Sequence, residues 1–266
     1  AAVASSSNIA WGTPDRPHAA SRQIVHSVYQ WMSDSDEYNI DVLGHRRWII
    51  NPDMLYSGFG EAEGYSAVYA HDKSRGDSSY YGVAWPAQNM PVEYFNDDDA
   101  WSVSFGMELT ASNVSVTLTR QNDGEVWNFS QNNPADGFFN VENGGYGQKG
   151  CVIFRPNNIS YSAGDRFNVS ISGVGSSPVT YTVDFFSVCN DDHDYESEQL
   201  SAPTCTEQGE TRLICQNCWD VKYEYESAHG HSYQMTGQSN GLYTMTCGEC
   251  GDEKVGSVPQ SIQVYW

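Results

Sequence analysis

The sequence predicts an α+β protein of several domains, and three observations lead to this expectation. Ile24, Val28 and Trp31 recur with helical spacing in a predicted helix over 17–33. Further along, apolar and polar residues alternate with the period of a β-strand, as in the run from Val114 to Thr119. Five of the seven cysteines follow residue 200, which indicates a local cysteine-stabilised structure there and not a disulfide framework over the whole chain. The predicted domains are 1–86, 87–190 and 191–266.

Composition excludes some partners. Of the 266 residues, 39% are hydrophobic, which is enough to build real cores. The net charge is −21, from 34 acidic and 13 basic residues, so we expect no nucleic-acid partner, because phosphate binding needs clustered Lys and Arg. No stretch of 18 apolar residues occurs, so the sequence predicts no transmembrane segment.

The N-terminal region predicts helices followed by strands. A short second helix over 41–50 carries His45, and Asn51-Pro52 ends it. Arg46 and Arg47 lie beside His45, and we expect them to pair with nearby acidic residues, in ion pairs that contribute little if they are exposed. The expected partners are Asp34, Asp36, Glu37 or Asp41. Clusters of Gly, Asp and Ser then separate three strand-like runs, at 55–60, 65–71 and 80–85.

The middle region is predicted to be all β. The run Trp85 to Pro91 holds two prolines and marks the expected seam before it. Asn122-Asp123-Gly124 is a hairpin signal between two strand-like runs. Six or seven short strands over about a hundred residues fit an immunoglobulin-like sandwich. An open barrel is the alternative.

The C-terminal region is poor in aliphatic residues, so it needs disulfides or a bound metal ion to stabilise it in place of a hydrophobic core. Two Cys-x2-Cys knuckles, Cys215 with Cys218 and Cys247 with Cys250, offer four thiolates for a structural Zn²⁺ ion in a zinc-ribbon-like module. Four thiolates leave no open position for catalysis. Disulfides are the alternative for a secreted protein.

A second set of residues could also supply the zinc ligands. The segments around Cys205 and His231 resemble a Cys/His repeat of surface proteins of Gram-positive gut bacteria. That resemblance implies Cys205, Cys215, Cys218 and His231 as the rival set of zinc ligands.

Four motifs occur in one order in the first 85 residues. They are Ser7-Asn8-Ile9-Ala10-Trp11-Gly12, Trp31 with Asp34 three residues on, Gly44-His45, and Ser57-Gly58-Phe59-Gly60. In this order they resemble the CAP superfamily, which includes cysteine-rich secretory (SCP-like) proteins, insect venom antigens, plant pathogenesis-related proteins and bacterial relatives. The resemblance implies an α-β-α sandwich whose cleft holds two histidines and two acidic residues that can bind a divalent metal.

The matched positions assign roles by resemblance. His45 matches the second histidine and Asp34 an acidic residue, which makes this pair the candidate catalytic group. Ser7 and Asn8 stand where the family has Glu-Asn, and they would line the cleft together with His71. The first histidine belongs to a helix that would precede Ser5, so the domain would be incomplete and a divalent metal in the cleft is not expected.

These observations favour a secreted or cell-surface protein of several modules that binds a lipid, a glycan or a protein. The alternative is a hydrolase that uses His45 as an acid or base, oriented by Asp34 and assisted by a metal. A structural spacer is the third possibility. We favour binding over catalysis, because one imidazole and one carboxylate make a hydrogen-bonded pair but not by themselves a hydrolase.

Overall fold

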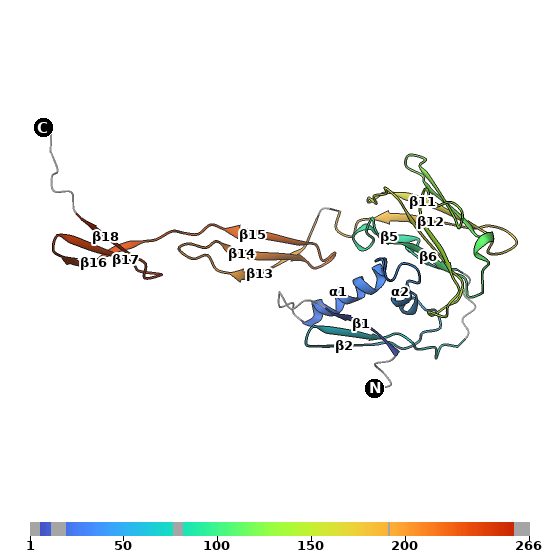
Figure 1. Cartoon of the computed structure of the whole chain (residues 1–266), viewed down its shortest axis with the longest axis horizontal. Coiled ribbons are helices and arrows are strands. Elements are labelled where there is room, and N and C mark those ends of the chain that lie inside the picture. The colour runs from blue at the N-terminus through green and yellow to red at the C-terminus, as the bar shows by residue number, and fades with distance from the viewer. Residues whose placement is uncertain (1–5, 12–19, 77–81, 191, 258–266) are drawn as a thin grey trace. The chain divides into compact units, whose positions relative to one another are not determined.

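The chain forms two compact units, Ala1–Val188 and Cys189–Trp266. A computed structural model describes residues 6–11, 20–76, 82–190 and 192–257 (Figure 1). The sequence predicted three domains, with boundaries after residues 86 and 190, whereas residues on both sides of residue 86 belong to one unit.

The first layer of unit 1 is a small antiparallel sheet with two helices against it. Its strands are β1 (Ser7–Trp11), β3 (Tyr65–Tyr69) and β2 (Gly58–Ala62), in the order β1-β3-β2. The helices α1 (Ala20–Ser33) and α2 (Gly44–Ile49) bring Trp31 and Trp48 against Val68 and Ala70. Successive strand residues point to opposite faces, so this core takes only every second residue of β3.

The predicted CAP-like α-β-α sandwich is wrong. The described residues contain two α-helices and five separate sheets, and the fold is predominantly β. Ile9, Trp11 and Tyr65 remain exposed, and by strand alternation they lie on the face of the small sheet opposite the buried Val68. The four short motifs specify local turns and contacts, but none of them specifies a second helical layer, which explains the error.

The larger part of unit 1 is a β-sandwich. One sheet has the order β4-β6-β10-β9 and the other β5-β12-β11-β7-β8. All described pairings are antiparallel except the parallel pair of β5 and β12. Two short 3-10 helices, Val92–Tyr94 and Ala111–Asn113, lie between strands. The strands are β4 (Val83–Trp85), β5 (Asn89–Pro91), β6 (Trp101–Ser104), β7 (Ser115–Arg120), β8 (Val126–Ser130), β9 (Gly137–Glu142), β10 (Cys151–Pro156), β11 (Arg166–Ser172) and β12 (Val179–Phe186).

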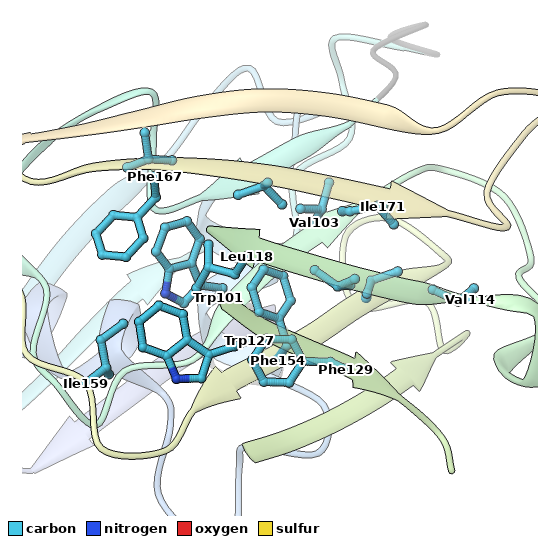
Figure 2. Packing of buried hydrophobic residues seen from close by; sticks show 14 of the residues in the cluster. Trp101, Val103, Val114, Leu118, Trp127, Phe129, Phe154, Ile159, Phe167 and Ile171 are labelled. Carbon is cyan, nitrogen blue, oxygen red and sulfur yellow. The ribbon is translucent and has the colours of Figure 1, made fainter. Parts of the chain in front are cut away.

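Apolar side chains from both sheets fill the space between them. Trp101 and Phe154 come from one sheet and Phe167 from the other, and all three are fully buried (Figure 2). The Trp101 indole N–H donates to the Tyr161 hydroxyl at 2.7 Å, which satisfies its buried polar group. The sandwich therefore has a continuous core, and its immunoglobulin-like connectivity stays a prediction.

The predicted seam at residue 86 falls inside this sandwich. The strand predicted over 80–85 is β4 where the structure describes it, and β4 pairs with β6. Only a short turn later, β5 pairs with β12 in the other sheet. The proline-rich run is thus a crossing from one sheet to the other, which needs a break in strand structure just as a domain linker does.

A buried arginine joins the helical layer to the sandwich. Arg46, in α2, is fully buried. Its guanidinium donates to the carbonyl oxygens of Met32 and Ser33 at the end of α1, and to that of Ala100 just before β6, the last at 2.5 Å. Burial lowers the pKa of Arg46 to about 10, so the side chain stays charged at neutral pH.

Arg47 is a second buried arginine that joins the helical layer to the sandwich. Its guanidinium donates to the carbonyl oxygens of Val42, Gly144 and Gln148, at 3.0, 2.9 and 2.5 Å. It also pairs with the Glu142 carboxylate at 2.5 Å. The expected pairs of Arg46 and Arg47 with nearby acidic residues are therefore wrong, because the planar fork suits converging backbone carbonyls in the interior.

Unit 2 contains two three-stranded antiparallel sheets, β13-β14-β15 and β16-β17-β18. Every residue of β15 and of β18 is exposed, and the buried residues are chiefly cysteines. No helix among the described residues of the whole chain has the length and apolarity to cross a membrane. The strands are β13 (Tyr195–Ser201), β14 (Gly209–Cys215), β15 (Val221–Glu226), β16 (Tyr233–Ser239), β17 (Leu242–Cys247) and β18 (Glu253–Ser257).

Replacing Arg46 should destabilise the whole of unit 1. We expect Arg46→Met to lower its free energy of unfolding by about 3 to 5 kcal/mol, because three buried carbonyl groups lose their donor. Arg46→Lys should recover only part of the loss, since an ammonium cannot reproduce the fork. Urea unfolding followed by tryptophan fluorescence measures the effect. Exposed Arg75 is the control, and an Arg75→Met loss as large as that of Arg46→Met would contradict the assignment.

Candidate metal centres

The first candidate centre lies at one end of the sheet β13-β14-β15. Cys189, His193, Cys215 and Cys218 each offer one ligand atom, and these atoms all lie within 4.8 Å of one another. The Sγ atoms of Cys189 and Cys215 are 3.6 Å apart, and the His193 Nδ1 atom is 3.3 Å from the Cys218 Sγ. The group contains three thiols and one imidazole, and it is called centre A below.

The second candidate centre, centre B, has the same composition. It consists of Cys205, His231, Cys247 and Cys250, again with ligand atoms within 4.8 Å of one another. The Sγ atoms of Cys205 and Cys247 are 3.7 Å apart, and the His231 Nδ1 atom is 3.1 Å from the Cys250 Sγ. Both histidines therefore present Nδ1 to the second cysteine of a knuckle.

These separations fit ligands around one ion. Two sulfur ligands at about 2.3 Å from a tetrahedral zinc ion lie about 3.8 Å apart, close to both observed sulfur–sulfur distances. A disulfide needs about 2.05 Å, and all seven cysteines are free in this structure. The Cys/His groups in the C-terminal unit can therefore hold metal ions.

The knuckle turns supply part of the chemistry. Burial raises the pKa of Cys215, but the backbone N–H groups of Cys218 and Asn217 outweigh it and lower the pKa to about 6. The N–H groups of Cys250 and Glu249 lower the pKa of Cys247 to about 6 in the same way. In each centre the knuckle N–H groups thus favour the thiolate of one cysteine, and the thiolate is the form that binds metal.

One of the other two cysteines in each centre behaves differently. Burial, helped by the neighbouring thiols, raises the pKa of Cys189 and of Cys205 to about 12. A cation at the centre removes that penalty, because it neutralises the thiolates that otherwise repel one another.

The same supporting contacts occur beside both histidines. His193 stacks on Tyr195, whose hydroxyl donates to Asp220 at 2.5 Å, and Lys222 lies over the tyrosine ring. At centre B these positions are His231, Tyr233, Asp252 and Lys254, in the same contacts. The two sheets are therefore structural repeats, each with one centre.

The structure does not bring the two knuckles together. Cys215 and Cys218 belong to centre A, Cys247 and Cys250 to centre B, and the alternative ligands Cys205 and His231 also belong to centre B. Sequence reasoning missed Cys189 and His193 as ligands. Their signal was the His-x-Tyr pattern before each knuckle, which would have predicted two sites in place of one.

The structure does bring Asp34 and His45 together. The His45 Nδ1 atom lies 2.8 Å from one oxygen of the buried Asp34 carboxylate. The backbone N–H groups of His45 and Arg46 donate to the other oxygen, at 2.9 and 3.2 Å. Since Leu43 gives α2 no side-chain cap, Asp34 caps the helix from a distant position. Its hydrogen bond raises the pKa of His45.

The other predicted cleft residues are divided between the two faces of the small sheet. The Asn8 side chain donates to the His45 carbonyl oxygen at 2.9 Å, so it braces α2. Ser7 precedes Asn8 in β1 and therefore points to the opposite face. His71 stacks on Trp48, with ring centroids 4.0 Å apart.

The residues on either side of Asp34 in the sequence line a surface cavity of about 740 Å³, but Asp34 itself does not. Its lining includes Ser33 and Ser35, together with Asp36, Glu37 and Arg155, but neither Asp34 nor His45. The pair therefore has a structural role in capping and bracing α2, and its catalytic role stays a prediction.

The Asp34–His45 pair makes stability depend on pH. The pKa of His45 is raised in the folded state, so the charged pair contributes stability below about pH 6.5, and this is lost as the pH rises through the folded-state value. We therefore expect His45→Gln to destabilise unit 1 more at pH 5.5 than at pH 8.5, measured by urea unfolding. His71→Gln is the control with the opposite trend, because burial and Lys73 lower the pKa of His71. Equal trends in both variants would contradict this interpretation.

No protein-family model and no curated protein matches this chain. The resemblance to the CAP superfamily thus rests on short motifs, and the predominantly β architecture contradicts it. The two Cys/His centres depend on geometry alone.

Proposed function

We propose that unit 2 is a pair of zinc-stapled β modules and that the chain is a binding or scaffolding protein that works outside the cell or at its surface. The observation that carries the zinc assignment is the pair of complete three-cysteine, one-histidine groups, one for each sheet. Net charge, exposed apolar surface and modular organisation support the rest.

The donor atoms favour zinc over other common ions. Thiolate and imidazole ligands in a four-atom cluster suit tetrahedral Zn²⁺, whereas Ca²⁺ and Mg²⁺ prefer six or more oxygen ligands. Four protein ligands leave no position open for water or substrate. The proposed ions are therefore structural.

Unit 2 needs such ions because its sheets bury little apolar surface. The apolar residues Val221, Leu242 and Val255 are all exposed. Ile214, just before the first knuckle, is a buried aliphatic residue. Two sheets of this size cannot offset their conformational entropy through hydrophobic burial alone. A zinc ion contributes about 10 to 16 kcal/mol to the folding of a small zinc domain, which is enough to make up the deficit.

Centre B also joins the two sheets of unit 2. Cys205 lies in the loop between β13 and β14, which belong to the first sheet, while Cys247 ends β17 of the second. An ion that binds both residues fixes the second sheet to a loop of the first. The modules are thus held together by coordination bonds in addition to the peptide link.

Binding is favoured over catalysis because Asp34, one of the two candidate catalytic residues, already accepts hydrogen bonds from the backbone. The Asp34 carboxylate caps α2, and the centres in unit 2 are closed. The exposed face of the small sheet carries Ile9, Trp11 and Tyr65, and apolar and aromatic side chains of this kind suit a lipid, glycan or protein ligand.

Metal analysis tests the zinc assignment. We expect the purified full chain to hold two zinc ions, and Cys215→Ser to hold one, because centre A loses a ligand while centre B stays intact. Inductively coupled plasma mass spectrometry after gel filtration gives the count. Cys151→Ala is the control, because Cys151 is buried in unit 1 and belongs to neither centre, so this variant should keep both ions. Zinc-free protein with blocked thiols would refute the assignment.

Loss of Cys205 should separate the sheets of unit 2. The segment between β15 and β16, residues 227–232, is already mostly exposed, and we expect Cys205→Ser to raise its rate of limited proteolysis at least tenfold, because the segment loses its link through centre B and can enter a protease more easily. Mass spectrometry locates the cut. Cys189→Ser should leave the rate of cleavage in this segment unchanged, since centre A does not include it. Equal cleavage in both variants would show that centre B does not join the sheets.

A further inference from the structure

A third group of metal-ligand atoms lies next to centre B. Cys205, His229 and Glu249 offer ligand atoms within 4.8 Å of one another. The Glu249 Oε2 atom is 3.6 Å from the Cys205 Sγ and 3.3 Å from the His229 Nδ1. These separations resemble those inside centres A and B, and Cys205 belongs to both groups.

His229 is held in the orientation of a metal ligand. Its backbone N–H donates to the Thr204 carbonyl at 3.2 Å, which places it beside Cys205. Its Nε2 atom is 3.0 Å from the Pro203 carbonyl oxygen. Because a carbonyl can only accept, Nε2 must carry the proton, and Nδ1 faces Glu249 with a lone pair in the neutral ring. An imidazole whose second nitrogen donates to a backbone carbonyl is the usual arrangement at metal sites.

Charge also favours a cation at this position. A Zn²⁺ ion with three thiolates and one neutral imidazole carries a net charge of −1, and Glu249 adds a second negative charge beside it. Centre A lacks this feature, because Asn217 occupies the knuckle position that Glu249 occupies in centre B. The two repeats therefore differ in the residue that would attract a further ion.

We propose that centre B binds a second divalent cation, of the zinc class, through Cys205, His229 and Glu249, with the Cys205 thiolate as a bridge between the two ions. Three protein ligands leave a fourth position for water, and His229 and Glu249 are largely exposed. This ion is therefore exchangeable, whereas the structural ions are enclosed. The inference rests on the proposed function, because the bridge requires an ion in centre B.

Zinc titration of the full chain tests the site. Native mass spectrometry at rising zinc concentration should give two tightly bound ions and then a third, which a weak chelator removes first. His229→Ala and Glu249→Gln should each weaken the third ion about tenfold or more and keep the other two. His26→Ala and Glu63→Gln, at exposed positions in unit 1, are the matched controls and should keep all three ions.

The outcomes separate the two proposals. A parent protein that stops at two ions overturns the bridged site and leaves the structural centres standing. A third ion that persists unchanged in both His229→Ala and Glu249→Gln also overturns it, because that ion then binds elsewhere on an acidic chain. Fewer than two tight ions in the parent protein refute the structural zinc proposal itself. Circular dichroism of each variant, unchanged from the parent, shows that a lost ion does not reflect unfolding.

Discussion

The buried guanidinium of Arg46 is the interaction on which unit 1 depends. It donates hydrogen bonds to carbonyl groups at the end of α1 and just before β6, so one charged group binds both the helical layer and the sandwich. A buried charge is costly unless every donor is used, and this requirement fixes both layers against each other. Arg47 repeats the principle with the segment after β9. The small sheet and the sandwich therefore form one unit, although each has its own apolar core.

Unit 2 solves the same problem of cohesion by different means. Its sheets have few apolar residues to bury, and most of its buried side chains are cysteines of the two centres. In unit 1, apolar area and buried arginines hold the layers together, and in unit 2, coordination would do so. With metal bound in unit 2, the two units of the chain would respond to different conditions, since hydrophobic burial is insensitive to chelators and metal coordination is not.

Local features were predictable from the sequence, and long-range ones were not. The helical stripe with Trp31, the alternation from Val114 onwards and the cysteine knuckles follow from periodicity and spacing, and the structure contains each of them. The burial of Arg46 and the meeting of Cys205 with Cys247 depend on partners 54 and 42 residues away, which no local pattern encodes. The α-β-α prediction failed for the same reason, because short motifs say nothing about which layer covers a sheet. The pairing of Asp34 with His45, 11 positions apart, was predicted through the resemblance to the CAP superfamily, and the structure brings these two side chains together.

The position of Cys205 in a loop of the preceding sheet has a mechanical consequence. Tension applied along the chain between the two sheets of unit 2 would pass through the metal–sulfur bonds of centre B as well as through the backbone from β15 to β16. With the ion in place this segment is a closed loop that cannot lengthen. Without it, the segment 227–232 is free to extend to a span of up to about 3.4 Å for each residue. A metal ion at centre B would therefore set how far the two sheets of unit 2 can be pulled apart.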